Sequence, residues 1–126
     1  MENSLLPLFN SFVQYLFLHQ IQLKMLHFQT KKYAIHKSVD MYLGKFNTNF
    51  DSFMEVAQGI SGKLTLKEIN IFIPTLNDEN VLSSLNDAVK MLKSINPKLK
   101  DFSELTTIND QMLADIQQLK YLLTFE

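Results

Sequence analysis

Two histidines and three carboxylates give the sequence its main candidate chemistry. His27 and His36 are separated by a short, mostly polar stretch, and Asp40, Asp51 and Glu55 follow in the same part of the chain. Imidazole nitrogens and carboxylate oxygens are ligands that iron, manganese and other divalent metals accept. The residue types therefore predict a metal site, with iron as the first candidate and another divalent metal as the second.

Helical spacing places four of these side chains on one face of a single helix. At about 100° per residue, Asp40, Asp51 and Glu55 lie about 40°, 60° and 100° around the axis from His36. Such a stripe is also compatible with a solvated face or with a structural polar interface. Lys45 and other polar residues already supply a solvent-facing side elsewhere on this helix. The three interpretations stay open at this point.

The rise along the helix separates the two halves of the candidate site. At about 1.5 Å per residue, His36 and Asp51 lie about 22 Å apart along the axis, which is too far for one metal ion. Two chains can join them if their second helices pack antiparallel about a two-fold axis. Gly44 lies near the midpoint between His36 and Glu55 and would allow a close approach. The sequence thus predicts a homodimer or higher homo-oligomer with two equivalent sites.

The elements that must position these residues are predicted from the periodicity of apolar side chains. Spacings of three and four predict helices over residues 4–30, 33–58, 78–95 and from 101 or 103 to 124. Ser4 is expected to cap the first helix, and Gly59 is expected to follow the end of the second.

Residues 63–77 differ from the rest of the chain. Ile69, Ile71 and Ile73 alternate with other residues and Pro74 follows, which predicts a short extended segment or an irregular crossover. The fold class is therefore all-α. We predict a single domain over residues 1–126, folded as a four-helix up-down bundle of ferritin-like type with a long crossover between helices 2 and 3.

Two segments resemble the mini-ferritin (Dps-type) family of the ferritin-like superfamily. His27 lies in HFQT, similar to the family's H-W-N at the end of its first helix. The pattern from His36 through Asp51 to Glu55 is similar to its H-x14-D-x3-E. The chain looks closer still to small phage and viral ferritin-like proteins of unknown function, in which HWQTKSYARHK is typical. Here that segment reads HFQTKKYAIHK, and a similar closing run covers residues 110–125.

The resemblance implies an inter-subunit iron site with ferroxidase-like activity. His27 and His36 would bind from one chain, Asp51 and Glu55 from the other, and Asp40 would help to hold a second metal. Fe(II) would be oxidised by peroxide or dioxygen, for detoxification or storage. The alternative is a non-enzymatic helical oligomer that retains a vestigial site for assembly or partner binding, and a weaker one is an interaction module that docks through its Phe-rich first helix.

Composition excludes several other classes. A net charge of −1 and the lack of a basic N-terminal tail argue against nucleic acid as a partner, and no cysteine is present to form a disulfide or a thiol nucleophile. No run of about 20 apolar residues predicts a membrane span. We expect a soluble, cytoplasmic protein, in the host-cell cytoplasm if viral. His19 is expected to be a buried or interfacial histidine and not a ligand.

Overall fold

The computed structural model describes residues 5–125, and all regular structure in this part of the chain is helical. The elements are α1 (Leu6–Gln29), α2 (Tyr33–Ser61), α3 (Val81–Ile95), a short 3-10 helix η2 (Asn96–Leu99) and α4 (Ser103–Leu122). The prediction of an all-α chain with four long helices is confirmed. The expected cap at Ser4 lies outside the described residues.

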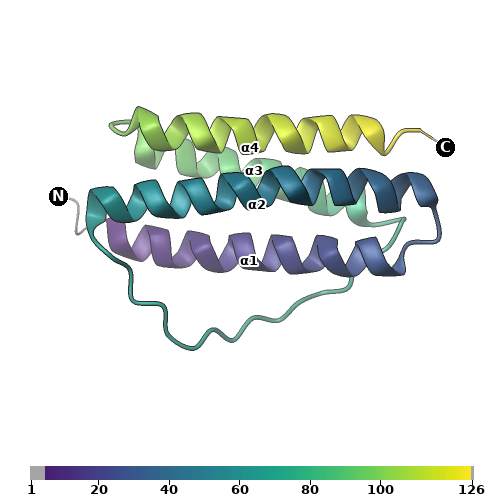
Figure 1. Cartoon of the computed structure of the whole chain (residues 1–126), viewed down its shortest axis with the longest axis horizontal. Helices are drawn as coiled ribbons and strands as arrows, with labels where there is room; N and C mark the ends of the chain where they lie inside the picture. The colour runs from purple at the N-terminus through teal and green to yellow at the C-terminus, as the bar shows by residue number, and fades with distance from the viewer. Residues whose placement is uncertain (1–4, 126) are drawn as a thin grey trace.

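The helices lie side by side as two antiparallel hairpins (Figure 1). α1 and α2 form the first hairpin, and α3 and α4 form the second. α2 packs against both α1 and α4, so it joins the two hairpins. The connection between α2 and α3 runs the length of the bundle, and α2 and α3 therefore point in the same direction (Figure 1).

This crossover is irregular, as the second of the two alternatives for residues 63–77 predicted. The crossover is held against the bundle near both ends. Leu64 and Leu76 are buried. The Leu64 N–H donates to the Gln58 side chain at 3.1 Å, and the Gln22 side chain of α1 donates to the Pro74 carbonyl at 2.9 Å. Between these points the alternating isoleucines are half-buried. The alternation of the isoleucines thus reflects burial of one side of an irregular segment and not a strand.

Two boundaries differ from the sequence-based expectation: α2 ends later than predicted, and α3 begins at Val81 instead of residue 78. α2 continues through Gly59 to Ser61, and the chain leaves the helix at Gly62, whose φ of 88° is unfavourable for other residues. The expectation that Gly59 would end this helix was wrong, because a glycine inside a well-packed helix costs only about 1 kcal/mol. At the same end of the bundle α3 stops before Pro97, as expected, and Asn109 of α4 donates to the Leu92 carbonyl at 2.8 Å.

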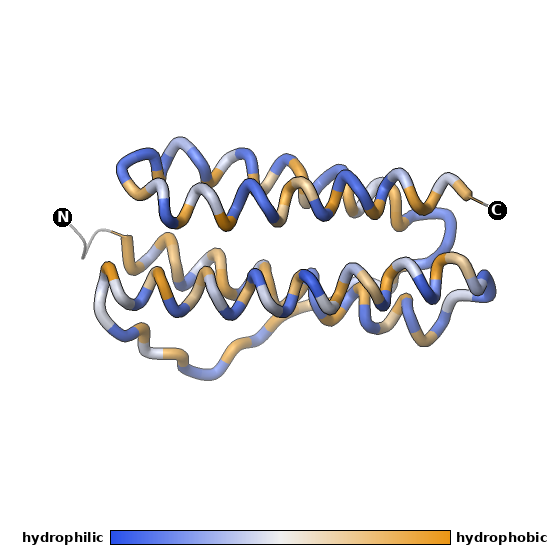
Figure 2. The backbone as a smooth tube through the Cα atoms, turned by 45° about the horizontal axis from the view of Figure 1, so that its top comes forward, coloured by the Kyte–Doolittle hydropathy of each residue, from blue (hydrophilic) through white to orange (hydrophobic). Residues whose placement is uncertain are grey.

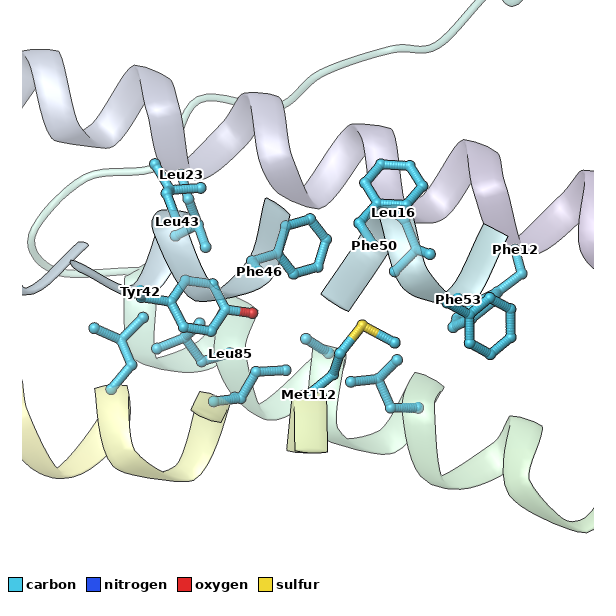
Figure 3. Close-up of a cluster of buried hydrophobic side chains, with 14 of the residues drawn as sticks. Phe12, Leu16, Leu23, Tyr42, Leu43, Phe46, Phe50, Phe53, Leu85 and Met112 are labelled. Atoms are coloured by element: carbon cyan, nitrogen blue, oxygen red, sulfur yellow. The ribbon is translucent and has the colours of Figure 1, made fainter. Parts of the chain in front are cut away.

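The core runs along the whole bundle and is rich in aromatic rings. Hydrophobic and hydrophilic segments alternate along each helix, the pattern of one-sided burial (Figure 2). Phe9 and Phe12 of α1 pack edge-on against Phe53 of α2, with ring centroids 6.2 and 5.1 Å apart. α3 and α4 contribute Leu85 and Met112 to the same cluster (Figure 3). All four helices are therefore fixed relative to one another by shared packing.

Candidate metal site

His27 and His36 meet at the end of the first hairpin. His27 lies in the last turn of α1 and His36 in the first turn of α2, and only residues 30–32 connect the two helices. The Thr30 N–H donates to the Leu26 carbonyl and closes α1, after which the chain reverses in an extended conformation. The tight reversal brings the imidazole rings face to face, with centroids 4.0 Å apart and planes inclined by 15°.

Reciprocal hydrogen bonds to the backbone fix both rings. Nδ1 of His27 lies 3.0 Å from the His36 carbonyl oxygen, and Nδ1 of His36 lies 2.8 Å from the His27 carbonyl oxygen. Because a carbonyl oxygen only accepts, each Nδ1 must carry the proton and donate it. In the neutral ring the lone pair is then on Nε2. Metal-binding histidines commonly use this arrangement, in which a backbone partner on one nitrogen fixes the tautomer of the other.

Aromatic and basic side chains surround the histidine pair. The exposed ring of Tyr33 stacks on His36 at 6.1 Å, and the exposed ring of Phe28 lies 5.4 Å from His27. Lys24 lies over the Phe28 ring at 5.3 Å. The segment from residue 24 to residue 39 holds four lysines and no carboxylate. Two carboxylates also lie at this end of the bundle: Asp40 follows His36 by one helical turn, and Asp78 accepts a hydrogen bond from Thr30 at 2.6 Å.

The three carboxylates of the candidate set lie apart from the histidines. Asp40, Asp51 and Glu55 are all exposed along α2, with Asp51 and Glu55 in the half of the helix furthest from His36. Within residues 5–125 no group of three or more His, Asp or Glu side chains is placed to hold a metal ion. One chain thus brings together two of the five predicted ligands, His27 and His36, and leaves the other three separate.

A second polar cluster lies inside the bundle, where sequence reasoning found only a buried histidine. His19 is 3% exposed, as expected, and its Nε2 is hydrogen-bonded to the Tyr42 hydroxyl at 2.8 Å. The Tyr42 ring lies among the buried hydrophobic side chains of the core (Figure 3). Nearby, the buried Asp115 accepts hydrogen bonds from Asn49 at 2.9 Å and from Gln111 at 3.0 Å.

Burial shifts the titration of these core groups. It lowers the pKa of His19 to about 4, because the charged ring would lose its hydration. The pKa of Tyr42 is raised, first by burial and then by the charge of Asp115. Burial and the Asp87 carboxylate raise the pKa of Tyr15 to about 12. At neutral pH these core groups are therefore a neutral histidine and neutral phenols. The sequence did not predict their contacts, because the residues lie far apart along the chain and follow no local pattern.

Fold and site together define a four-helix protein with a stacked, hydrogen-bonded pair of histidines at one end. Residues 27–123 match the model of a family of unknown function, DUF5856, and because this match covers most of the chain, the protein belongs to that family. Neither the curated proteins nor the solved structures include a significant match. In the described part of the chain, no helix is both long and apolar enough to cross a membrane.

Proposed function

We propose that the protein binds iron at a site shared between two chains and oxidises Fe(II) there. The observation that carries the proposal is the reciprocal bonding of His27 and His36, which leaves Nε2 of each neutral ring as a lone-pair donor. Two such nitrogens are an incomplete set for a metal of this kind, and the carboxylates missing from one chain are Asp51 and Glu55 of a second. Asp40 would assist a second, more weakly held ion.

The architecture supports this proposal. Two antiparallel helical hairpins joined by a crossover of the bundle's full length are the arrangement of ferritin-like proteins (Figure 1). The resemblance of the histidine and carboxylate segments to mini-ferritins points to the same class. In this class the second helix would supply ligands from both of its ends.

The donor set suits iron that changes oxidation state. Neutral imidazoles suit Fe(II), whereas carboxylates stabilise the higher charge of Fe(III). Fe(II) is the substrate here, and each ion loses one electron. Reduction of one hydrogen peroxide to two waters therefore consumes two Fe(II) and two protons. The residues contribute by binding and orienting the ions, and a metal that does not change oxidation state would occupy the same ligands without turnover.

Complementation between two inactive variants tests the shared site. The variant H27A/H36A removes the ligands of one half, and D51N/E55Q removes those of the other. Each alone should neither bind nor oxidise Fe(II) at the site. Mixed in equal amounts with free exchange, half of the dimers contain one chain of each kind, and each of these has one intact site out of two. The mixture should therefore regain about a quarter of the wild-type sites.

The controls decide between the possible outcomes. D78N replaces a carboxylate that accepts a hydrogen bond from the Thr30 hydroxyl at 2.6 Å. This variant should leave Fe(II) oxidation unchanged. No activity in the mixture, with exchange confirmed by mass spectrometry of the intact dimers, would contradict a site built from two chains. Full activity in D51N/E55Q alone would show that these carboxylates are not ligands.

The alternative is a helical oligomer without redox activity, favoured by one observation. In residues 5–125 no group of three or more His, Asp or Glu side chains is placed to hold a metal ion within one chain. A wild-type protein that forms dimers but neither binds nor oxidises Fe(II) would establish this second function. Oxidation at the rate of free Fe(II) in buffer is the corresponding readout.

A further inference from the structure

We propose that the cavity where α1, the crossover and the start of α3 meet binds a small organic cation, an ammonium group carried on an aliphatic chain. The proposal stands apart from the proposed function, because none of the five candidate metal ligands lines this cavity. It can be tested on metal-free protein, and its failure would leave the proposed iron site unaffected.

The cavity lies where the crossover returns to the bundle. Its volume of about 590 Å³ is within the range of about 300–1,000 Å³ that is typical of small-molecule sites. The last turn of α1 lines one part of it, and the end of the crossover and the residues before α3 line the rest. Leu26 and Leu76 are buried and give the cavity an apolar floor. A floor of this kind favours the aliphatic part of a ligand.

Hydrogen bonds hold the segment before α3 in one conformation. Asn77 and Asn80 bond reciprocally, since the N–H of each donates to the Oδ1 of the other at 2.8 Å. The Glu79 N–H donates to the same Oδ1 of Asn77 at 3.0 Å. The Thr30 hydroxyl donates to Asp78 at 2.6 Å and ties the turn after α1 to this segment. The cavity is therefore preformed, which lowers the cost of binding a ligand.

The charges of the lining favour a positive ligand. Two carboxylates, Asp78 and Glu79, line the cavity against a single cation, Lys31. Because Asp78 already accepts the hydrogen bond from Thr30, we assign the exposed Glu79 carboxylate to the ligand. The last turn of α1 adds the negative end of the helix dipole, which favours a cation at this place.

Phe28 gives a second, independent reason for a cation. Its ring is 68% exposed and lines both this cavity and a neighbouring groove between α1 and α2. Lys24 lines the groove and not the cavity, and its ammonium lies 5.3 Å from the centroid of the Phe28 ring. The face of an aromatic ring attracts an ammonium group in this way. In the cavity, the Phe28 ring is open to the ammonium of a ligand.

These groups together define the ligand. Its ammonium contacts the Glu79 carboxylate and the Phe28 ring, and its aliphatic chain covers Leu26 and Leu76. At an exposed site each of the two charge contacts changes affinity by about 2- to 5-fold, so a neutral molecule of the same shape should bind about 10-fold more weakly. A carboxylate on the same chain would be repelled by Glu79.

Titration of the metal-free protein with three probes of equal chain length, followed by amide NMR, tests the proposal. Hexylamine carries the ammonium group, hexanol is neutral and hexanoate is an anion. Hexylamine should shift the amide signals of Phe28, Thr30, Leu76 and Glu79, and should bind about 10-fold more tightly than hexanol. Its affinity should fall as salt is added, whereas that of hexanol should not. Hexanoate should not bind.

Two variants with matched controls test the contacts of the ammonium group. Glu79→Gln removes a carboxylate beside the N-terminus of α3, and its control Glu104→Gln removes one in the first turn of α4, away from the cavity. Phe28→Leu removes the ring, and its control Phe72→Leu removes an exposed ring of the crossover. All four side chains are exposed, so the variants should fold, as checked by circular dichroism. Glu79→Gln and Phe28→Leu should each weaken hexylamine binding by about 2- to 5-fold, and the controls should not change it.

Four results would overturn the proposal. Equal affinities for hexylamine and hexanol would show that the cavity does not select a cation. Tighter binding of hexanoate would show that Lys31 determines the charge of the ligand. Hexylamine shifts confined to residues outside the cavity would place the amine elsewhere. An unchanged affinity for hexylamine in both Glu79→Gln and Phe28→Leu would remove the two contacts on which the proposal rests.

Discussion

Acid should destabilise the bundle through His19, and the size of the effect follows from its burial. The ring is neutral when folded, with a pKa lowered from 6.5 to about 4. Below pH 6.5 His19 takes up a proton in the unfolded chain, whereas in the folded chain it stays neutral until about pH 4. The contribution of His19 to the free energy of unfolding is therefore complete above pH 6.5 and falls as the pH is lowered. This lowering of the pKa corresponds to about 3 kcal/mol in total, of which about 2 kcal/mol is lost by pH 5.

Urea unfolding at a series of pH values, followed by far-UV circular dichroism, measures this loss. The reference protein is the double variant His19→Phe/Tyr42→Phe, which removes the titrating ring and the hydroxyl that would lose its partner. Other titrating groups are common to both proteins, so their contributions cancel in the difference of unfolding free energies. That difference should change by about 2 kcal/mol between pH 7 and pH 5.

A flat difference over this range would refute the reasoning. It would mean that the folded protein accepts a proton on His19 without penalty, through a local opening near Tyr42 or through water reaching the ring. A change of opposite sign would mean that the ring is stabilised in its charged form by a carboxylate. Asp115 is the closest candidate, since it is buried near Tyr42.

Three further predictions, which use five substitutions, test the fold by urea unfolding. Phe53→Ala should lower the free energy of unfolding by about 3–5 kcal/mol because the ring is fully buried. Met41→Ala, at an exposed position of the same helix, should change it by less than about 0.5 kcal/mol. Similar changes in the two variants would contradict the core assignment. Asn109→Ala should cost about 1–3 kcal/mol through the lost bond to the α3 carbonyl, and a neutral result would show that water replaces it. Gly62→Ala should cost about 1 kcal/mol because its φ is positive, while Gly59→Ala should stabilise by about 0.5–1 kcal/mol; equal effects would disprove the helix end assigned here.

The sequence predicts the helices well because each must bury one side. The apolar spacing through Phe9, Phe12 and Leu16 defines α1, and the break at Asn96 and Pro97 marks the end of α3. Helix ends were less certain. Both Gly59 and Gly62 are compatible with ending α2, and only the tertiary path of the crossover shows which of them takes the positive φ.

The candidate site was predictable in its residues and not in its geometry. Spacing alone shows that His36 and Asp51 cannot meet in one chain. Spacing does not show that the reversal at residues 30–32 stacks His27 on His36, because ring orientation depends on hydrogen bonds to specific carbonyls. The contacts of His19 with Tyr42 and of Asn49 with Asp115 join separate helices, and no local pattern reports such pairs.

The crossover gives the molecule a point at which it can be divided. Residues 65–73 belong to no helix and include no fully buried side chain. The contacts that hold the bundle are instead those of α2 with α1 in its own hairpin and with α4 of the other hairpin. A chain cut there would yield two helical hairpins, each with an apolar face shaped for the other. The covalent link therefore raises the local concentration of two modules that already fit. The two halves should reassemble when produced separately, with His27 and His36 carried together on the piece that holds α1 and α2.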